Sequence, residues 1–215
     1  ISACALSVVL QGAGPMQRID GTDTFEIHIN NTVKESLPEH YLLNWVEKGT
    51  LESHSVVSPY SFSPQLSDFD LNLFSAGKHL HAYRFLGSHL ATVDGVDGCL
   101  FAVWAPNVKR VSVVGDFNRR HGLRHPMRSR GNSGIWELFI PGLHELDNYK
   151  FEIRTHQDEI LKKSDPYART MALRPDTTSR ITPTDSYNWR DGDWLDVRRQ
   201  WQWLHSPMSI YEVHA

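Results

Sequence analysis

Seven basic side chains stand between residues 109 and 130 of this 215-residue chain, with Asp116 as the single acid among them. Guanidinium and ammonium groups gathered in this way could bind an anion or a nucleic acid. However, no nucleic-acid-binding motif accompanies them, and the formal net charge of the whole chain is −3. We therefore expect a solvated rim and no nucleic-acid partner. The seven are Lys109, Arg110, Arg119, Arg120, Arg124, Arg128 and Arg130.

The same stretch contains two of the chain's 12 histidines, His121 and His125, which stand four residues apart. On one face of a helix this spacing could hold a metal ion. The surrounding residues are typical of a loop, and no nearby cysteine or acidic pair completes a tetrahedral shell. We expect neither a metal site nor a cofactor.

Seven tryptophans offer a third kind of chemistry, because an aromatic face can stack on a sugar ring. Trp136 is in phase with Leu138 and Ile140 in an alternating stretch, which favours a place in a core. Trp104 is out of phase with Phe101 and could instead face a neighbouring domain. A second group lies near the carboxyl end, at Trp189, Trp194, Trp201 and Trp203.

Short alternating stretches must position these side chains. Apolar residues recur at every second position in them, which is the period of half-buried β-strands, and Pro106 with Asn107 marks a tight turn between the first two. Together they predict an antiparallel β-sandwich of immunoglobulin-like type over residues 85 to 183. The stretches are 101–105, 111–114, 136–140 and 149–153.

The first part of the chain shows a weaker likeness to the second. Residues 25–29 correspond to 136–140, and Ser-Pro-Tyr at 58–60 corresponds to Asp-Pro-Tyr at 165–167. Duplication of one sandwich accounts for this likeness. The alternative is that alternating apolar residues recur in any β protein.

The character of the sequence changes over the last forty or so residues. A stretch typical of a helix covers 194–204, Pro207 ends it, and an apolar strand follows at 209–214.

In its order of motifs the chain resembles the amino-terminal region of bacterial 1,4-α-glucan (glycogen) branching enzymes, members of the α-amylase superfamily. The resemblance covers most of the chain, and its spacing makes a chance match implausible. The motifs include Ser-Pro-Gln-Leu at 63–66, Phe-Ala-Val-Trp-Ala-Pro-Asn at 101–107, Val-Val-Gly-Asp-Phe-Asn at 113–118, His-Pro-Met at 125–127, Gly-Ile-Trp-Glu-Leu-Phe-Ile-Pro at 134–141, Lys-Ser-Asp-Pro-Tyr-Ala at 163–168 and Ser-Pro-Met-Ser-Ile-Tyr-Glu-Val-His at 206–214.

The resemblance implies an all-β fold of two tandem immunoglobulin-like sandwiches, followed by a connector and the first strand of a (β/α)8 barrel. The expected domains are an amino-terminal sandwich over 1–75 that lacks its start, a carbohydrate-binding-module-like sandwich over 76–184, and the connector with the strand over 185–215. It further implies that the complete enzyme forms α-1,6 branches in glycogen by retaining transglycosylation. None of the superfamily's catalytic Asp and Glu motifs occurs in this chain, so we expect it to be inactive alone.

The resemblance also implies functional residues. Related modules place a tryptophan just after Gly-Asp-Phe-Asn, where this chain has Arg120, while Asn118 and Lys150 keep the pattern. These three are the predicted carbohydrate contacts, with α-1,4-glucan as the partner, and Arg120 stands where related modules have a stacking ring. Four aromatic residues are predicted to pack between domains, against the catalytic barrel: Trp104, Trp189, Trp194 and Tyr211.

Two alternatives stay open: a debranching or trehalose-forming hydrolase of the same superfamily, and a non-catalytic glucan-binding module. For location, the apolar residues 1–10 are too short to span a bilayer and lack the features of a signal peptide. Two cysteines, Cys4 and Cys99, form no disulfide framework. We therefore expect a cytoplasmic protein without a membrane partner.

Overall fold

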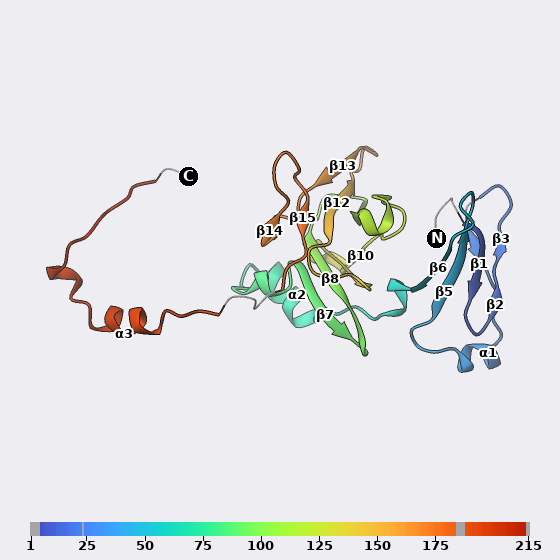
Figure 1. Cartoon of the computed structure of the whole chain (residues 1–215), viewed down its shortest axis with the longest axis horizontal. Helices are drawn as coiled ribbons and strands as arrows, with labels where there is room; N and C mark the ends of the chain where they lie inside the picture. Colours follow the sequence, from blue (N-terminus) through green and yellow to red (C-terminus); the bar gives the residue numbers. More distant parts are fainter. Residues whose placement is uncertain (1–4, 23, 184–187, 214–215) are drawn as a thin grey trace. The chain divides into compact units, whose positions relative to one another are not determined.

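The computed structural model describes residues 5–22, 24–183 and 188–213, and within these the regular structure is mostly β-sheet with few helices. The chain divides into two compact units, Ile1–Pro183 and Thr184–Ala215. Figure 1 labels the elements along the chain. The described residues also form five short 3-10 helices, four in the first unit and one in the second. They are η1 (Pro59–Ser61), η2 (Ala82–Arg84), η3 (Asp116–Asn118), η4 (Gly131–Ser133) and η5 (Trp203–His205).

The amino-terminal residues form a four-stranded antiparallel sheet with the order β2-β1-β5-β6. A separate two-stranded pair, β3 with β4, and the short helix α1 accompany it. Asn30 caps α1 by accepting a hydrogen bond from the backbone N–H of Val33 at 2.9 Å. The bounds are β1 (Ala5–Leu10), β2 (Gly14–Pro15), β3 (Gln17–Arg18), β4 (Phe25–Glu26), α1 (Asn31–Ser36), β5 (Leu42–Glu47) and β6 (Ser53–Val57).

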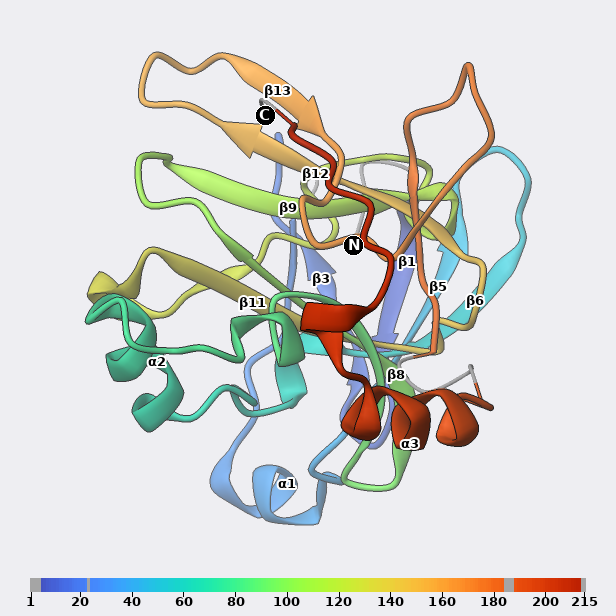
Figure 2. The same ribbon diagram turned by 90° about the vertical axis from the view of Figure 1, so that its left-hand side faces the viewer.

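Two further antiparallel sheets form the central sandwich. The first has the order β10-β11-β8-β7, and in the second β12 pairs with β9, β13 and β15, while β15 also pairs with β14. Figure 2 shows β9 and β12 in one layer and β8 and β11 in the other. The bounds are β7 (Gly87–Val93), β8 (Val96–Trp104), β9 (Arg110–Gly115), β10 (Arg128–Ser129), β11 (Ile135–Pro141), β12 (Asn148–Arg154), β13 (Ile160–Lys163), β14 (Thr170–Met171) and β15 (Ser179–Arg180).

The predicted strands are present, but the two that flank Pro106 do not pair with each other. β8 pairs with β7 and β11, whereas β9 pairs with β12, so the turn at 106–107 carries the chain from one sheet to the other. The strand that does form a hairpin with β8 is β7. Asp94 and Gly95 join them with φ values of 52° and 80°, as a two-residue turn between twisted strands requires.

The main core lies between the two sheets of the central sandwich. Phe101 of β8 packs edge to face on Tyr149 of β12, with ring centroids 4.9 Å apart. Trp136 packs against this core as its phase predicts, and its indole Nε1 donates to the carbonyl of Ala105 at 2.9 Å. Buried side chains of the core include Cys99, Val103, Val111, Val113, Leu138, Ile140, Phe151 and Ile181.

A helix covers the other face of the β8–β11 sheet. Ser67 caps the start of helix α2 (Asp68–Ser75), because its hydroxyl accepts a hydrogen bond from the N–H of Asp70 at 3.1 Å. The helix ends before Gly77, which has a φ of 67°. Leu71 of this helix belongs to a second buried cluster with Ala102 and Ile135. Because this sheet is covered on both faces, residues of either phase are buried, which alternation alone does not predict.

A buried ion pair ties the segment before α2 to β11. Glu137 is 1% exposed and accepts hydrogen bonds from the backbone N–H groups of Gln65 and Leu66, at 2.9 and 3.0 Å. Arg130 donates to the same carboxylate at 2.8 Å. Every oxygen of this buried charge therefore has a partner, which is the condition for tolerating it inside a protein.

The second unit contains helix α3 (Gly192–Gln200) and η5, close to the helical stretch expected at 194–204. The strand predicted at 209–214 is not formed, since residues 209–213 have no regular structure, and residue 214 lies outside the described part. A strand needs neighbours for its backbone hydrogen bonds, and no described strand pairs with residues 209–213. Among the described residues, no helix has the length and apolar character required to cross a membrane.

Candidate functional site

The turn that follows β9 contains Asn118 and Arg120, two of the three residues predicted to contact carbohydrate. Arg119 and Arg120 have φ values of 56° and 55°, in the left-handed region that non-glycine residues rarely occupy. The N–H of Arg120 donates to the carbonyl of Gly115 at 2.8 Å, which closes the turn. Both guanidinium groups consequently extend from a fixed backbone at the rim of the sandwich, with the Arg120 side chain 56% exposed.

Asn118 lies inside this turn and is 1% exposed. Its Oδ1 accepts from the N–H of Gly115 at 3.0 Å, and its Nδ2 donates to the carbonyl of Val113 at 2.8 Å. The same Nδ2 lies 2.8 Å from Nδ1 of His125, which accepts when the imidazole is neutral. In this position Asn118 holds the turn in place.

Burial lowers the pKa of His125 to about 4, and the nearby charge of Arg124 acts in the same direction. The imidazole is therefore neutral at pH 7, as its contact with the Asn118 amide requires. The sequence interpretation of His125 as half of a metal-ligand spacing did not anticipate this role as a partner of Asn118.

Arg120 is exposed and Lys150 is half-buried, near the same end of the sandwich. Lys150 lies on β12 opposite Val114, and its Nζ donates to the hydroxyl of Thr177 at 2.6 Å. Nε of Arg120 contacts Oδ1 of Asp116 at 3.0 Å. The carbohydrate role of Asn118, Arg120 and Lys150 stays a prediction.

The four aromatic residues predicted to pack between domains are all exposed. Trp104 is 55% exposed, and its ring meets Phe74 of α2 edge to face at 6.3 Å. Within the second unit, Trp189, Trp194 and Tyr211 have exposed fractions of 73, 59 and 93%. Exposed aromatic surface of this kind is what a docking domain would cover, and the assignment stays a prediction.

Sequence reasoning missed an ion pair formed by residues 72 positions apart. Both terminal nitrogens of Arg119 donate to the carboxylate of Glu47 on β5, one of them at 2.7 Å. Glu47 is 5% exposed, and the hydrogen bonds from Arg119 lower the pKa of its carboxyl group. No local pattern could have paired these two residues, because only the fold brings β5 to the turn after β9.

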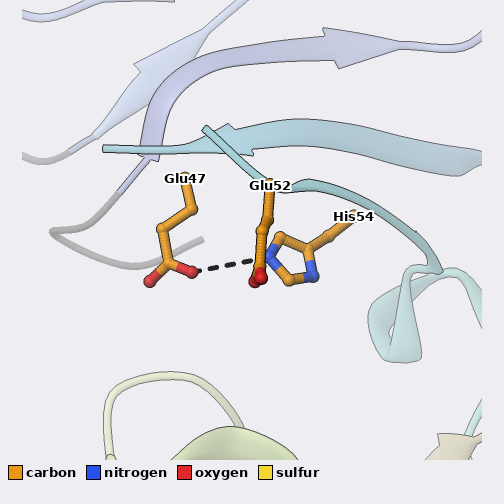
Figure 3. A group of neighbouring side chains, drawn as sticks. All are labelled: Glu47, Glu52 and His54. Carbon is orange, nitrogen blue, oxygen red and sulfur yellow. Dashed lines mark ion pairs between the residues drawn. The ribbon is translucent and has the colours of Figure 1, made fainter. Parts of the chain in front are cut away.

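Glu47 also belongs to a group of metal-ligand side chains in the described part of the chain. Ligand atoms of Glu47, Glu52 and His54 lie within 4.8 Å of one another, and Nε2 of His54 is 3.6 Å from Oε2 of Glu47 (Figure 3). Arg119 already binds both carboxylate oxygens of Glu47, so a cation would compete with a guanidinium group for the same atoms. The arrangement therefore favours the ion pair over a metal.

Comparison with known proteins defines the class first. Residues 85–168 match carbohydrate-binding module 48, the isoamylase N-terminal domain, and this span runs from the end of η2 through β13. The central sandwich is thus similar to a carbohydrate-binding module of this type.

Curated relatives then show which proteins the whole chain is similar to. The chain is 53% identical over 201 residues to the 1,4-alpha-glucan branching enzyme of Methylococcus capsulatus, covering 93% of this chain and 27% of the relative. It is 49% identical over 211 residues to that of Hydrogenovibrio crunogenus, covering 98% of this chain and 29% of the relative. The chain thus spans little more than a quarter of these relatives. The resemblance to the amino-terminal part of glycogen branching enzymes is confirmed.

A solved structure of pullulanase from Klebsiella pneumoniae aligns with a TM-score of 0.40 at 16% identity, over 85% of this chain and 22% of its own. A likeness this weak carries no argument about function.

Proposed function

We propose that this chain is the amino-terminal portion of a 1,4-α-glucan branching enzyme, which forms α-1,6 branches in glycogen. One observation carries the proposal. Proteins named as branching enzymes align over 93 to 98% of this chain, and about half of the aligned residues are identical. The carbohydrate-binding module at 85–168 supports a polymeric glucan as the substrate.

In the proposed reaction, two carboxyl groups of a catalytic barrel act through a covalent glycosyl-enzyme intermediate, as in retaining glycosidases. An α-1,4 bond is cleaved, and the glycosyl group passes to the C6 hydroxyl of another chain instead of to water. This segment contributes no catalytic residue, because a barrel site is assembled from loops after several strands. Its part is to hold glucan and to dock on the barrel.

The proposed organisation has three parts. An amino-terminal immunoglobulin-like sandwich covers 1–75, a second sandwich covers 76–184, and 185–215 form the connector and the first strand of the barrel. That strand would complete its hydrogen bonds on barrel neighbours. Trp104, Trp189, Trp194 and Tyr211 would then cover their exposed rings against the barrel.

Glucan would contact the central sandwich at its exposed rim, through Arg120 and Lys150 beside the turn held by Asn118. Arginine and lysine donate several hydrogen bonds each, which suits sugar hydroxyls, although the rim lacks the stacking ring common in related modules. A cytoplasmic location would place the enzyme with glycogen.

The test uses the endogenous protein, measured by intact mass and assayed on amylose by iodine staining. We expect a product several hundred residues longer than this chain that shifts the iodine colour without releasing reducing sugar. Release of reducing sugar would identify a hydrolase instead. A product that changes neither the colour nor the reducing ends would overturn the enzymatic proposal.

A further inference from the structure

A cleft of about 860 Å³ lies within the first unit, between the amino-terminal sheet and the central sandwich. Small-molecule sites are typically about 300–1,000 Å³ and often form where two domains meet. Asn118 of the turn after β9 lines it together with Arg119, whereas Arg120, Lys150 and the exposed tryptophans do not. The cleft therefore adjoins that turn on the side away from the exposed rim.

One wall of the cleft is a single face of the amino-terminal sheet. Leu43, Trp45 and Glu47 alternate along β5, and His54 and Val56 of β6 stand opposite Trp45 and Leu43 in the register. Cross-strand partners share a face, so these side chains form one continuous surface. Trp45 and His54 stack with centroids 4.9 Å apart at an interplanar angle of 22°. The wall thus carries a stacked aromatic pair, called the platform below, in which the inner faces of the two rings cover each other and the outer faces are left for a ligand.

The opposite wall includes residues from two connections of the central sandwich. Asp116 and Arg119 belong to the turn after β9, Arg124 follows on the same connection, and Asp97 stands at the start of β8. Asp116 and Asp97 are exposed. Oδ1 of Asp116 contacts Arg120 at 3.0 Å and Oδ1 of Asp97 accepts from the Thr92 hydroxyl at 2.6 Å, so a ligand would bind the second oxygen of each carboxylate. The ion pair between Arg119 and Glu47 joins this wall to the sheet.

The charges of the lining indicate what kind of ligand fits. Its carboxylates belong to Glu47, Asp97 and Asp116, and its guanidinium groups to Arg119 and Arg124. These charges nearly cancel, which disfavours a phosphorylated ligand, because a phosphate site needs an excess of positive charge. Carboxylates beside an aromatic platform instead match a neutral molecule with hydroxyls on its edge and C–H groups on its face.

We propose that this cleft binds a segment of α-1,4-glucan, with a pyranose ring against the Trp45 and His54 platform and its hydroxyls on Asp97 and Asp116. The proposal rests on the proposed function, since it takes its substrate class from the branching reaction. It gives the amino-terminal sheet a role in holding the polymer, at a place other than the exposed rim of the module.

The experiment measures binding of maltoheptaose to this chain by isothermal titration calorimetry, with a matched pair of variants. Val56 is 40% exposed on the cleft face, and Val9 of β1 is 38% exposed. Val9 stands opposite Asn44, whereas Val56 stands opposite Leu43, so the two valines lie on opposite faces of one sheet. Val56→Trp fills the cleft and should weaken binding at least about tenfold, whereas Val9→Trp should leave it unchanged.

A second variant does not depend on packing in the sheet. Asp97→Ala removes an exposed carboxylate at the hairpin and should weaken maltoheptaose binding about tenfold, the loss expected for one charge-assisted hydrogen bond. Circular dichroism of each variant verifies the fold.

Three results would overturn the cleft site. The first is that the unaltered chain fails to bind maltoheptaose. The second is that Val56→Trp and Val9→Trp weaken binding equally. The third is that binding survives Val56→Trp and is lost in Lys150→Ala. None of these touches the branching proposal, which the iodine assay on the endogenous protein decides by itself. Conversely, loss of branching with intact maltoheptaose binding would leave a glucan-binding cleft in a protein of another activity.

Discussion

The amino-terminal sheet and the central sandwich are both antiparallel, yet they bury their side chains very differently. In β8 and β11 of the sandwich, residues of both phases are buried, because a second sheet covers one face and α2 covers the other. In β1 the buried residues are Ala5, Val8 and Leu10, while Leu6 and Val9 are 52 and 38% exposed. The same strand pattern therefore yields a full core in one region and a thin one in the other.

Polar contacts join the amino-terminal sheet and the segment after it to the central sandwich. Arg128 of β10 donates to the carbonyls of Phe62 and Tyr60 at 2.6 and 2.9 Å, and the hydroxyl of Tyr60 donates to the carbonyl of Pro126 at 3.0 Å. Arg119 adds the ion pair with Glu47. The comparison teaches that strand content does not measure stability, which depends on the apolar area removed from water.

The largest effect should come from the core of the central sandwich. Phe101→Ala removes a fully buried ring, so we expect the free energy of unfolding to fall by about 3–5 kcal/mol. Val8→Ala, in the amino-terminal sheet, removes two buried carbons and should cost about 1–2 kcal/mol. Amide hydrogen exchange resolves the two regions, and equal loss of protection in β8 by both variants would contradict the comparison.

A smaller effect should follow from His125. The pKa is about 4 in the folded protein and near 6.5 otherwise, so the unfolded chain binds more protons between these pH values. Stability is thus complete above about pH 6.5 and falls by roughly 2–3 kcal/mol as the pH drops to about 4. Chemical denaturation across this range measures the slope.

The matched control for this pH dependence is the exposed neighbour of His125 on the same loop. His125→Asn should flatten the slope in this window, while His121→Asn should keep it. An unchanged slope in the His125 variant would show that another group causes the pH dependence.

The smallest effect should come from the ion pair that joins the two regions. The Arg119 side chain is 55% exposed, so water screens it and the coupling with Glu47 should be weaker than either effect above. A double-mutant cycle with Glu47→Gln and Arg119→Gln measures this coupling. Hydrogen exchange in β5 and β6 should rise more than in β8, and a rise confined to β8 would oppose a bridging role.

Local patterns predicted the strands of the sandwich well. The alternation through Phe101, Val113, Leu138 and Tyr149 correctly identified β8, β9, β11 and β12, because alternate positions of a strand face the same side. The pattern could not reveal that β8 and β9 belong to different sheets, since pairing is not local. It also placed a strand after residue 208, where the described residues offer no partner strand.

Site prediction met a similar limit. The motif around Gly115 predicted carbohydrate contacts in this turn, yet Asn118 is buried within it. Motifs indicate which residue types recur at a position, whereas exposure depends on how the backbone turns. The left-handed φ values of Arg119 and Arg120 are the feature that directs one side chain to Glu47 and the other to solvent.

By itself, the sequence determined the resemblance to branching enzymes, the strand positions and the main core, because motif order, alternation and residue type are local properties of the chain. Only the tertiary structure decided the rest. Chain segments 72 residues apart meet at Glu47 and Arg119, and β5, β6 and the loops of the sandwich enclose one cleft. The physical reason is that burial, ion pairing and cavity shape are properties of residues that become neighbours only after folding.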